Sequence, residues 1–598
     1  MCGIVGYNGS KKDSKNILIE GLKKLEYRGY DSAGIALKDN NDIKITKATG
    51  KIKNLEAKLD NKTTTLGIGH TRWATHGEPN ETNSHPHQVG DITIVHNGII
   101  ENYKELKEEL INKGYNFKSE TDTEVACALI DYYYQKDKDI KKALSNFIDK
   151  VKGAYALGII VKGNDKLYSI RKDCPLIIGK GKVGNLIASD ILAISEHVNK
   201  ILYLEEDTIA EISDNEIKLY NKNLKEINPI FKDIPKGEYT SDKCGFEHYM
   251  LKEIHEQPKV FKKTTDKYIQ NEIENLKKEM PNFKKYNKIH IVACGSAYHT
   301  GLVGKNLIEE YANIPVEVEI ASEYRYKKNF YDKKTLLIVV SQSGETADTL
   351  AALRKAKNDN IDTLAIVNVN NSTIAREAKH VLITEAGPEI AVATTKAYSA
   401  QVATFGLIAL NIALEKNIIK KEELKEILKE IKELPIQIEN TINNCNYKEI
   451  ANSIYERDDI FFIGRGIDYA LCMEGSLKLK EISYIHSQAY AAGELKHGTI
   501  SLVENNTPVI GIITEQNLKD KTISNIEEVK SRGAKTIVIT NDDTIKNYDY
   551  ITYIPKVHKI LQPLLTVLPL QLISYEVAHL RDCDIDKPKN LAKSVTVE

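Results

Sequence analysis

The second half of the chain contains the same supersecondary pattern twice, and this repeat constrains the fold more than any other feature. Three segments, each an apolar run followed by an amphipathic stretch, begin near residues 290, 336 and 363, and matching segments begin near 460, 509 and 535. The order is kept and each offset is close to 170 residues, which indicates two copies of one unit. Apolar strands alternating with amphipathic helices predict, in each copy, a doubly wound α/β fold with a parallel sheet covered by helices on both faces.

The loops that follow these strands are the first place to look for a ligand site. Ligands of such sheets bind at the carboxyl ends of the strands. The loops 293–301, 341–346 and 464–468 are expected to lie there.

The first half has a different pattern. Residues 66–77 and 91–100 predict strands, and Tyr103–Lys113 and Thr121–Tyr134 carry apolar residues at helical spacing. Strands mixed with a few helices favour an α+β fold over strict alternation. Residues 228–246 combine proline, glycine and charge without periodicity, and we interpret them as a linker. The expected division is a domain at 2–227, a linker at 228–246, repeat units at 280–419 and 450–588, and a tail at 589–598.

Composition excludes several classes of protein. The 83 Lys and Arg residues almost balance the 84 Asp and Glu residues, so no nucleic-acid partner is expected. Eight cysteines without a C-x-x-C pair argue against a disulfide scaffold or structural zinc, and for a reducing, cytoplasmic compartment. No signal peptide is visible, and the apolar stretch 560–580 is interrupted by two prolines. We expect that stretch to be a buried core helix and no membrane partner.

Cys2 is the first candidate for catalysis. Removal of Met1 would give an N-terminal cysteine, whose α-amine can act as the general base for its own thiol. Attack on an amide also needs oxyanion donors, and Asn97 and Gly98 follow an apolar run at a strand end. Arg72 can hold a carboxylate and Asp122 an ammonium group. Together these residues supply what glutamine hydrolysis demands.

A second candidate site lies in the first repeat. Residues Ser341 to Thr346 follow a strand and open a helix, where hydroxyls and free N–H groups favour a phosphate. No Walker lysine follows, which argues against a nucleoside triphosphate.

Two further patterns are set aside. Gly179 to Gly184 fits G-x-G-x-x-G, but no amphipathic helix follows it, so we predict a glycine-rich hairpin turn. The histidines at 70, 76, 85, 87 and 96 lack matching ligands at metal-site spacing, and no metal or cofactor is expected.

The segments MCGIVGYNG, LEYRGYDSAG, HTRWATHG, HNGIIENY and ETDTE, in this order, resemble class II glutamine amidotransferases. The second half, with ACGSAYHTG, SQSGETADTL, LKLKEISYIHSQAYAAGELKHG and NLAKSVTVE, resembles tandem sugar isomerase (SIS) domains. The resemblance runs from residue 2 to Glu598 and implies an N-terminal-nucleophile (Ntn) αββα sandwich followed by two SIS subdomains. It implies transfer of the amide nitrogen of L-glutamine to fructose 6-phosphate, with isomerisation to glucosamine 6-phosphate, the first step of hexosamine (UDP-GlcNAc) biosynthesis. A homodimer is implied as well.

The resemblance also implies roles for individual residues. In the first half, Cys2 would form a γ-glutamyl thioester, Asn97 and Gly98 would be the oxyanion donors, and Trp73 would gate an ammonia channel. In the second half, Glu481 would carry the proton, His497 would open the sugar ring and Lys593 would form a Schiff base. The remaining implied roles are glutamine binding by Arg72, Thr75, His76 and Asp122, and sugar-phosphate binding by Ser296, Ser341, Gln342, Ser343, Thr346 and Val392.

Other functions remain open at this stage. One alternative is an enzyme that keeps the glutaminase but aminates another ketose phosphate, or that uses its second half as an ammonia-independent isomerase or deaminase. A sugar-phosphate sensor is a third possibility, because SIS modules also serve as ligand-binding parts of regulators. Glu481, His497 and Lys593 together favour catalysis over sensing.

Overall fold

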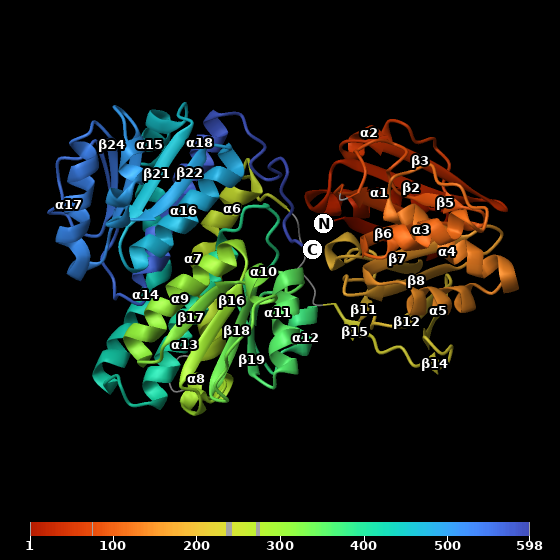
Figure 1. The fold of residues 1–598 in the computed structure, drawn as a ribbon, viewed down its shortest axis with the longest axis horizontal. Coiled ribbons are helices and arrows are strands. Elements are labelled where there is room, and N and C mark those ends of the chain that lie inside the picture. Colours follow the sequence, from red (N-terminus) through yellow and green to blue (C-terminus); the bar gives the residue numbers. More distant parts are fainter. Residues whose placement is uncertain (1, 75, 235–241, 271–274, 597–598) are drawn as a thin grey trace. The chain divides into compact units, whose positions relative to one another are not determined.

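The computed structural model describes residues 2–74, 76–234, 242–270 and 275–596. The chain divides into two compact units (Figure 1): the first contains the residues up to Ser241 together with those from Ala592 onward, and the second contains Asp242–Leu591. Each unit is described by itself.

The first unit contains two antiparallel sheets. Its larger sheet has eight strands within the described residues, in the order β15-β11-β9-β10-β1-β4-β2-β3. Their bounds are β15 Lys232–Asp233, β11 Lys200–Tyr203, β9 Ile177–Lys180, β10 Gly184–Ala188, β1 Gly3–Gly9, β4 Leu66–Arg72, β2 Ser32–Asp39 and β3 Asp42–Thr49.

The second sheet of this unit has seven described strands in the order β14-β13-β12-β8-β7-β6-β5. Their bounds are β14 Glu226–Ile227, β13 Ile217–Asn221, β12 Thr208–Ile212, β8 Leu167–Lys172, β7 Gly153–Val161, β6 Ile92–Ile100 and β5 His87–Val89. The helices of this unit are α1 Ser14–Leu25, η1 Glu26–Arg28, α2 Ile52–Glu56, α3 Tyr103–Ile111, α4 Asp122–Asp137, α5 Ile140–Lys150 and η2 Ile191–Ala193.

The buried residues show how these layers are stacked. One apolar cluster lies between the sheets and includes Ile4 and Ile68 of the first sheet and Val95 of the second. A second cluster packs α1 on the outer face of the first sheet, and a third packs α3, α4 and α5 on the second. Helix, sheet, sheet and helix therefore form four layers, and the predicted αββα sandwich is confirmed.

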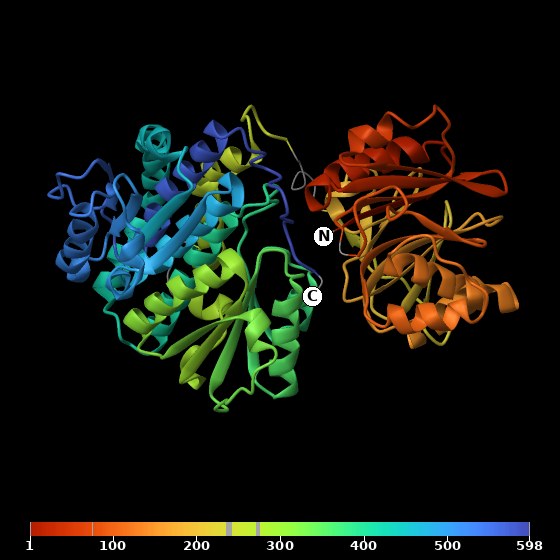
Figure 2. The same cartoon turned by 45° about the horizontal axis from the view of Figure 1, so that its top comes forward.

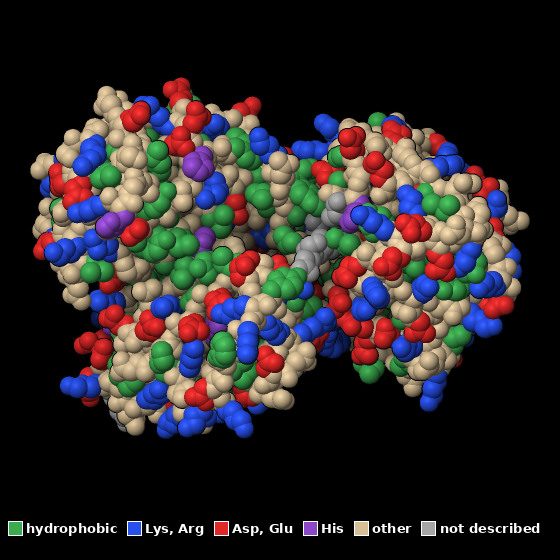
Figure 3. Space-filling view, in the orientation of Figure 1, with side chains coloured by type: hydrophobic (Ala, Val, Ile, Leu, Met, Phe, Trp, Pro, Cys, Tyr) green, Lys and Arg blue, Asp and Glu red, His purple; other side chains and the backbone are tan. Residues whose placement is uncertain are grey.

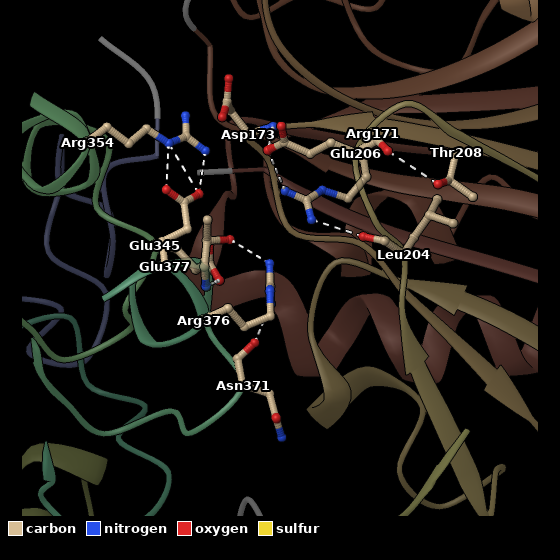
Figure 4. Close-up of polar contacts among 11 residues, drawn as sticks. Arg171, Asp173, Leu204, Glu206, Thr208, Glu345, Arg354, Asn371, Arg376 and Glu377 are labelled. Carbon is tan, nitrogen blue, oxygen red and sulfur yellow. Dashed lines mark hydrogen bonds and ion pairs between the residues drawn. The ribbon is translucent and has the colours of Figure 1, made fainter. Parts of the chain in front are cut away.

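The predicted hairpin around the G-x-G-x-x-G pattern is also confirmed, because β9 and β10 pair antiparallel with Lys180 opposite Asn185. The buried guanidinium of Arg171, in β8 of the second sheet, donates to the carbonyl of Leu204 at 2.9 Å and contacts Glu206 (Figure 4). This contact ties β8 to the chain that follows β11.

The second unit holds two parallel sheets of the same topology, each with five described strands. The first has the order β17-β16-β18-β19-β20 and the second β22-β21-β23-β24-β25. Their bounds are β17 Val316–Ile320, β16 Lys288–Ala293, β18 Thr335–Ser341, β19 Asp362–Val367, β20 His380–Ile383, β22 His486–Ala491, β21 Asp459–Gly464, β23 Pro508–Ile513, β24 Lys535–Thr540 and β25 Tyr550–Tyr553. The three strands recognised in each sequence copy occupy equivalent places, so the predicted repeat and its parallel sheets are confirmed.

Helices cover both sheets and join them (Figure 2). A single apolar core contains residues of β16 and β18, of β21 and β23, and of the long helices α9, α13, α16 and α18. The helices of this unit are α6 Tyr249–His255, α7 Gln257–Ile269, α8 Leu276–Glu279, η4 Phe283–Lys285, α9 Gly295–Ala312, α10 Ala321–Tyr324, α11 Ala347–Asn358, α12 Thr373–Glu377, α13 Lys396–Glu415, α14 Lys421–Asn444, α15 Tyr447–Ile454, α16 Ile467–Ser483, η5 Glu494–His497, η6 Thr499–Leu502, η7 Gln516–Leu518, α17 Lys519–Lys530 and α18 Gln562–Leu580.

Two helices of this core are strongly apolar. Helix α18 is buried along nearly its whole length, as predicted for residues 560–580. Among the described residues, α13 is long and apolar enough to cross a membrane by length and composition, but 94% of its most apolar window is buried inside the protein. Both are core helices of a globular unit. On the face shown in Figure 3, basic and acidic side chains are interspersed on each unit.

Candidate active sites

Cys2 lies immediately before β1, at the edge of a small pocket in the first unit. Its thiol accepts a hydrogen bond from the backbone N–H of Trp73 at 3.2 Å. Burial raises the pKa of the Cys2 thiol, and Arg72 and this hydrogen bond only partly oppose the rise. The thiol is therefore protonated at neutral pH, and a nucleophilic role requires a base that removes its proton.

Asn97 and Gly98 lie in β6, beside Cys2. The Asn97 side-chain nitrogen donates to the Cys2 carbonyl oxygen at 3.0 Å, so the amide is next to the thiol-bearing residue. Gly98 has φ +125°, and a Cβ there would lie 2.0 Å from the carbonyl oxygen of Ala154. This position therefore accepts only glycine.

The charged candidates lie around the same pocket. Its lining includes Cys2, Arg72, Trp73, His76, Gly98 and Asp122. Arg72 is 3% exposed and donates to the carbonyl oxygens of His76, Gly77 and Glu78, which fixes the loop that follows β4. The Asp122 carboxylate accepts the backbone N–H of Ile100 at 2.8 Å. A cation and an anion thus face one pocket, as binding of an α-amino acid requires.

Trp73 and His76, two further predicted site residues, each pack against a tyrosine ring. Trp73 is half-buried and its ring meets Tyr30 edge-on, with centroids 5.9 Å apart. His76 makes a similar edge contact with Tyr103 at 5.2 Å. Thr75, a predicted glutamine ligand, lies outside the described residues.

The pocket is also lined by residues that sequence reasoning did not assign: His85, His96, Thr121 and Thr123. His85 and His96 belong to a buried group that we call the histidine cluster, made of His70, His85, His87 and His96. Two hydroxyls organise it: Thr123 contacts His85 and His96, and Thr121 contacts His87. The sequence shows five histidines between residues 70 and 96, but only the fold shows that four of them meet in one buried group.

Burial lowers the pKa of every member of the histidine cluster. It lowers the pKa of His70 to about 3, and those of His85 and His87 well below their usual value. The pKa of His96 is lowered for the same reason. All four are neutral when the protein is folded at neutral pH, and within the described residues none belongs to a group with metal-ligand geometry.

The second candidate site is built on the loop after β18. The Ser341 hydroxyl lies 2.9 Å from that of Thr346 and accepts the N–H of Gly344 at 3.0 Å. The Ser343 hydroxyl accepts the N–H of Glu345 at 3.2 Å. Gly344 has φ +66°, and a Cβ there would lie 1.9 Å from the hydroxyl of Ser372. Hydroxyls thus gather in a tight turn at the N-terminus of α11, an arrangement suited to a phosphate.

A hydrogen bond and an ion pair connect this loop and the helices beside it. The Glu345 carboxylate accepts the N–H of Thr373 at 2.8 Å, which joins the loop to α12. Arg354 of α11 binds the carboxylate of Glu377 at the other end of α12, with its shortest contact at 2.7 Å (Figure 4). The loop therefore rests on two connected helices.

Glu481 belongs to a buried network between α9 and α16. The Lys478 ammonium lies 2.5 Å from Glu481 and 3.4 Å from Glu474. Glu474, which is fully buried, also accepts the hydroxyl of Ser296 at 2.9 Å and contacts His299 at 2.8 Å. The structure thus brings Ser296 and Glu481 into one network. Sequence reasoning missed Glu474 and His299, although Glu474, Lys478 and Glu481 are spaced for one helix face.

Burial and charge act in opposite directions on Lys478. Burial disfavours its ammonium, but the Glu474 and Glu481 carboxylates outweigh burial, and the pKa of Lys478 is raised. Lys478 therefore remains charged and keeps both carboxylates paired.

The other predicted sugar-site residues belong to other segments of the chain. Gln342 follows Ser341 in the loop, and its carbonyl accepts the N–H of Asn368 at 3.1 Å. The backbone of buried Val392 donates to the Asp586 carbonyl at 3.0 Å. His497 is exposed at the end of η5. Lys593 lies in the tail that groups with the first unit.

Known protein families match each of the two units separately. A family model described as a SIS domain matches residues 282–411 and 453–581, and one described as a glutamine amidotransferase domain matches residues 70–196. The chain is 52% identical over 612 residues to a glutamine–fructose-6-phosphate aminotransferase (isomerizing) of Clostridium tetani, and 49% identical over 611 residues to one of Caldanaerobacter subterraneus. Both alignments cover 100% of either chain.

Among solved structures, the C-terminal domain of glucosamine-fructose-6-phosphate aminotransferase from Francisella tularensis is similar to part of this chain. It superposes with a TM-score of 0.55 at 38% identity, covering 58% of this chain and 100% of that one. The length of the matched part is that of a tandem SIS unit.

Proposed function

The chain belongs to the family of glutamine–fructose-6-phosphate aminotransferases (isomerising), and from this premise we propose which of its residues carry each step. It is an enzyme that transfers the amide nitrogen of glutamine to fructose 6-phosphate and isomerises the product to glucosamine 6-phosphate, releasing glutamate. The residue roles, the path of ammonia, the assembly and the compartment are our proposals.

The first unit hydrolyses glutamine. After removal of Met1, the free α-amine of Cys2 takes the thiol proton, and the thiolate attacks the amide carbon. Asn97 and the Gly98 N–H stabilise the oxyanion, and ammonia leaves as the γ-glutamyl thioester forms. Arg72 holds the α-carboxylate and Asp122 the α-amine, with Thr75 and His76 completing the glutamine site. Water then releases glutamate.

The second unit aminates the sugar. Hydroxyls of Ser341, Ser343 and Thr346, with Gln342, hold the phosphate and sugar, and Ser296 and Val392 complete the site. His497 opens the sugar ring, and Lys593 condenses with the C2 ketone to form an imine and water. Ammonia displaces Lys593, leaving an imine at C2. Glu481 then removes a proton from C1 and one is returned to C2, which gives the aldehyde and the amine.

Ammonia passes from one site to the other without entering solution, and Trp73 is its gate. We also propose a homodimer, cytoplasmic and without a nucleic-acid or membrane partner. The free state of all eight cysteines supports a reducing compartment. The proposed functional boundaries are 2–227 for the glutaminase, 228–246 for the linker, 280–419 and 450–588 for the SIS subdomains, and 589–598 for the tail.

One observation carries this assignment: the Cys2 thiol accepts the Trp73 N–H while the Asn97 amide lies on the neighbouring carbonyl, in a pocket that also contains Arg72 and Asp122. A nucleophile, an oxyanion donor and groups of both charges therefore meet at one place. Simple structural packing has no need for that combination.

The test uses glutamine labelled with nitrogen-15 at the amide, together with fructose 6-phosphate, and mass spectrometry of the products. We expect nitrogen-15 in an amino-hexose phosphate. A Cys2→Ala variant supplies the matched control: it should form no labelled product but should still use added ammonium. Formation of glutamate and labelled ammonia without labelled amino sugar would refute the sugar assignment, and no glutamate from chain lacking Met1 would refute the glutaminase assignment.

A competition experiment tests the ammonia path. With labelled glutamine and an excess of unlabelled ammonium, a channel keeps nitrogen-15 in the amino sugar. Dilution of the label to the isotope ratio of the solution would show that ammonia escapes. Trp73→Ala should lower the fraction of nitrogen-15 in the amino sugar toward the isotope ratio of the solution.

A further inference from the structure

The Asn97 amide is held at both ends, and the second contact comes from a buried histidine. Its nitrogen donates to the Cys2 carbonyl at 3.0 Å, and its oxygen lies 3.1 Å from Nε2 of His70. The same Nε2 lies 2.9 Å from the carbonyl oxygen of His96. Because both neighbours of Nε2 are oxygens that can only accept, this nitrogen must carry the proton and donate to both.

The surroundings of His70 favour this one protonation state. His70 lies in the middle of β4 and is fully buried. Its Nδ1 has no hydrogen-bond partner, and its ring stacks on His85 with centroids 4.1 Å apart. A proton on Nδ1 would be buried and unpaired, whereas a proton on Nε2 makes two hydrogen bonds, so burial selects the Nε2–H form.

The orientation of the Asn97 amide follows from this. An amide can rotate by half a turn and exchange its oxygen and nitrogen, which would point an acceptor at a developing oxyanion. A donor at the Asn97 oxygen opposes that rotation. One hydrogen of the Asn97 nitrogen is used by Cys2, and the other makes no hydrogen bond to any residue that the structure describes. That hydrogen is free to bind the oxyanion.

We propose that His70 is a positioning residue of the glutaminase: through Nε2–H it fixes the Asn97 amide so that its nitrogen faces the oxyanion formed at Cys2. His70 touches neither the thiol nor the glutamine and acts only through Asn97. The inference rests on the proposed glutaminase function of the first unit and adds a residue to which neither the sequence motifs nor the comparisons assign a role.

Two amide variants separate positioning from simple packing. In His70→Gln the side-chain nitrogen reaches the place of Nε2, whereas in His70→Asn it ends near Nδ1, one methylene short. Both variants are polar and smaller than histidine. The readouts are kcat and KM for glutamine hydrolysis in the full-length chain lacking Met1, and ammonium-dependent formation of glucosamine 6-phosphate as a measure of the second unit.

We expect His70→Asn to lower kcat for glutamine about 10- to 100-fold, less than the loss of a whole oxyanion donor, with KM changed less than about threefold. His70→Gln should stay within about threefold of the unchanged enzyme in kcat. His87→Asn is the matched control, because His87 is also buried in the histidine cluster, 5% exposed against 0% for His70, but has no hydrogen bond to Asn97. The kcat of this variant should fall less than that of His70→Asn. Ammonium-dependent synthesis should be unchanged in all three.

Other outcomes are equally informative. Equal kcat in the Gln and Asn variants of His70, or a loss that appears in KM alone, would overturn the positioning role while leaving the glutaminase assignment intact. If the unchanged enzyme produced no glutamate, the proposed function itself would fail. Should His70→Asn not fold, as judged by Trp73 fluorescence, the His70→Gln kcat still decides: a fall of more than tenfold in that folded variant contradicts the proposal.

Discussion

Replacing Lys478 by methionine should destabilise the second unit strongly. The Lys478 side chain is 1% exposed, and its ammonium contacts the carboxylates of Glu481 and Glu474. Methionine keeps most of the apolar stem but removes the charge. Glu474, whose side chain is 0% exposed, then keeps Ser296 and His299 as its hydrogen-bond partners among the described residues.

The size of the effect follows from these burials. Removing one partner of a buried ion pair costs about 3–5 kcal/mol, because the remaining charge stays buried without compensation. The Glu481 side chain is 21% exposed and can turn toward water, so it contributes little to the loss of stability. The hydrogen bonds to Glu474 from Ser296 and His299 persist, which places the expected loss near the lower end, about 3 kcal/mol.

The pH of the measurement follows from the pKa of Lys478. The folded protein raises this pKa, so the ammonium stabilises the fold fully below the pKa of an unfolded lysine, about 10.4. That contribution is lost only as the pH rises through the raised folded value. A measurement at pH 7.5 therefore reports the whole effect.

Urea unfolding of the full chain is the assay, followed by circular dichroism for both units and by Trp73 fluorescence for the first. Trp73 is the only tryptophan, so its transition is an internal control that should not move. Lys480→Met is the matched variant on the same helix; Lys480 is exposed, and the cost should stay below about 0.5 kcal/mol. The double variant Lys478→Met with Glu474→Gln should recover most of the stability, because no buried charge is left unpaired. A double variant no more stable than Lys478→Met would refute the reasoning.

Three further results are expected. Histidines in the unfolded chain have a pKa near ~6.5, so lowering the pH from 7.5 to 5.5 should destabilise the first unit by about 1.4 kcal/mol for each member of the histidine cluster that stays neutral when folded. Urea unfolding followed by Trp73 fluorescence measures this loss. Unchanged stability would show that these residues are protonated in the fold. Gly98→Ala should abolish glutamine hydrolysis but spare ammonium-dependent synthesis, because its Cβ would meet the Ala154 carbonyl. Gly344→Ala should raise KM for fructose 6-phosphate at least tenfold, because its Cβ would displace the Ser372 hydroxyl, which lies against the loop 341–346. KM for glutamine serves as the control.

Most of the fold could be predicted because its signals are local or periodic. The repeat in the second half is visible as three strand–helix segments in the same order, and each segment became a central strand of a parallel sheet. The strands at the sheet edges, such as β20 and β25, have four residues each, too few to show a period of their own. They are specified by the neighbour they pair with, which a local pattern does not contain.

The residues of the candidate sites also differ in whether a local sequence pattern predicts them. Ser341 could be placed from the sequence, because the strand that ends there and the helix after it define its position. Asn97 was expected at a strand end, but β6 continues past it to Ile100, so its place within the strand comes from the fold. Glu474 and His299 could not be placed from the sequence, since the two residues are separated by 175 positions and meet only when α9 packs on α16. The role of His70 depends on one hydrogen bond across two sheets, which again only the fold supplies.

The two repeats show why the fold alone does not determine the site. They have the same strand order, yet the loops after their equivalent strands β18 and β23 differ. After β18 the loop carries the hydroxyls of Ser341, Ser343 and Thr346. After β23 the backbone N–H groups of Thr514 and Glu515 donate to the buried Asp468 carboxylate at 2.8 and 3.2 Å. In the second repeat, the Asp468 carboxylate thus already binds the N–H donors at the strand end. In the first repeat, the equivalent strand end carries hydroxyls instead. Equal topology therefore leaves one repeat suited to an external phosphate and the other satisfied internally.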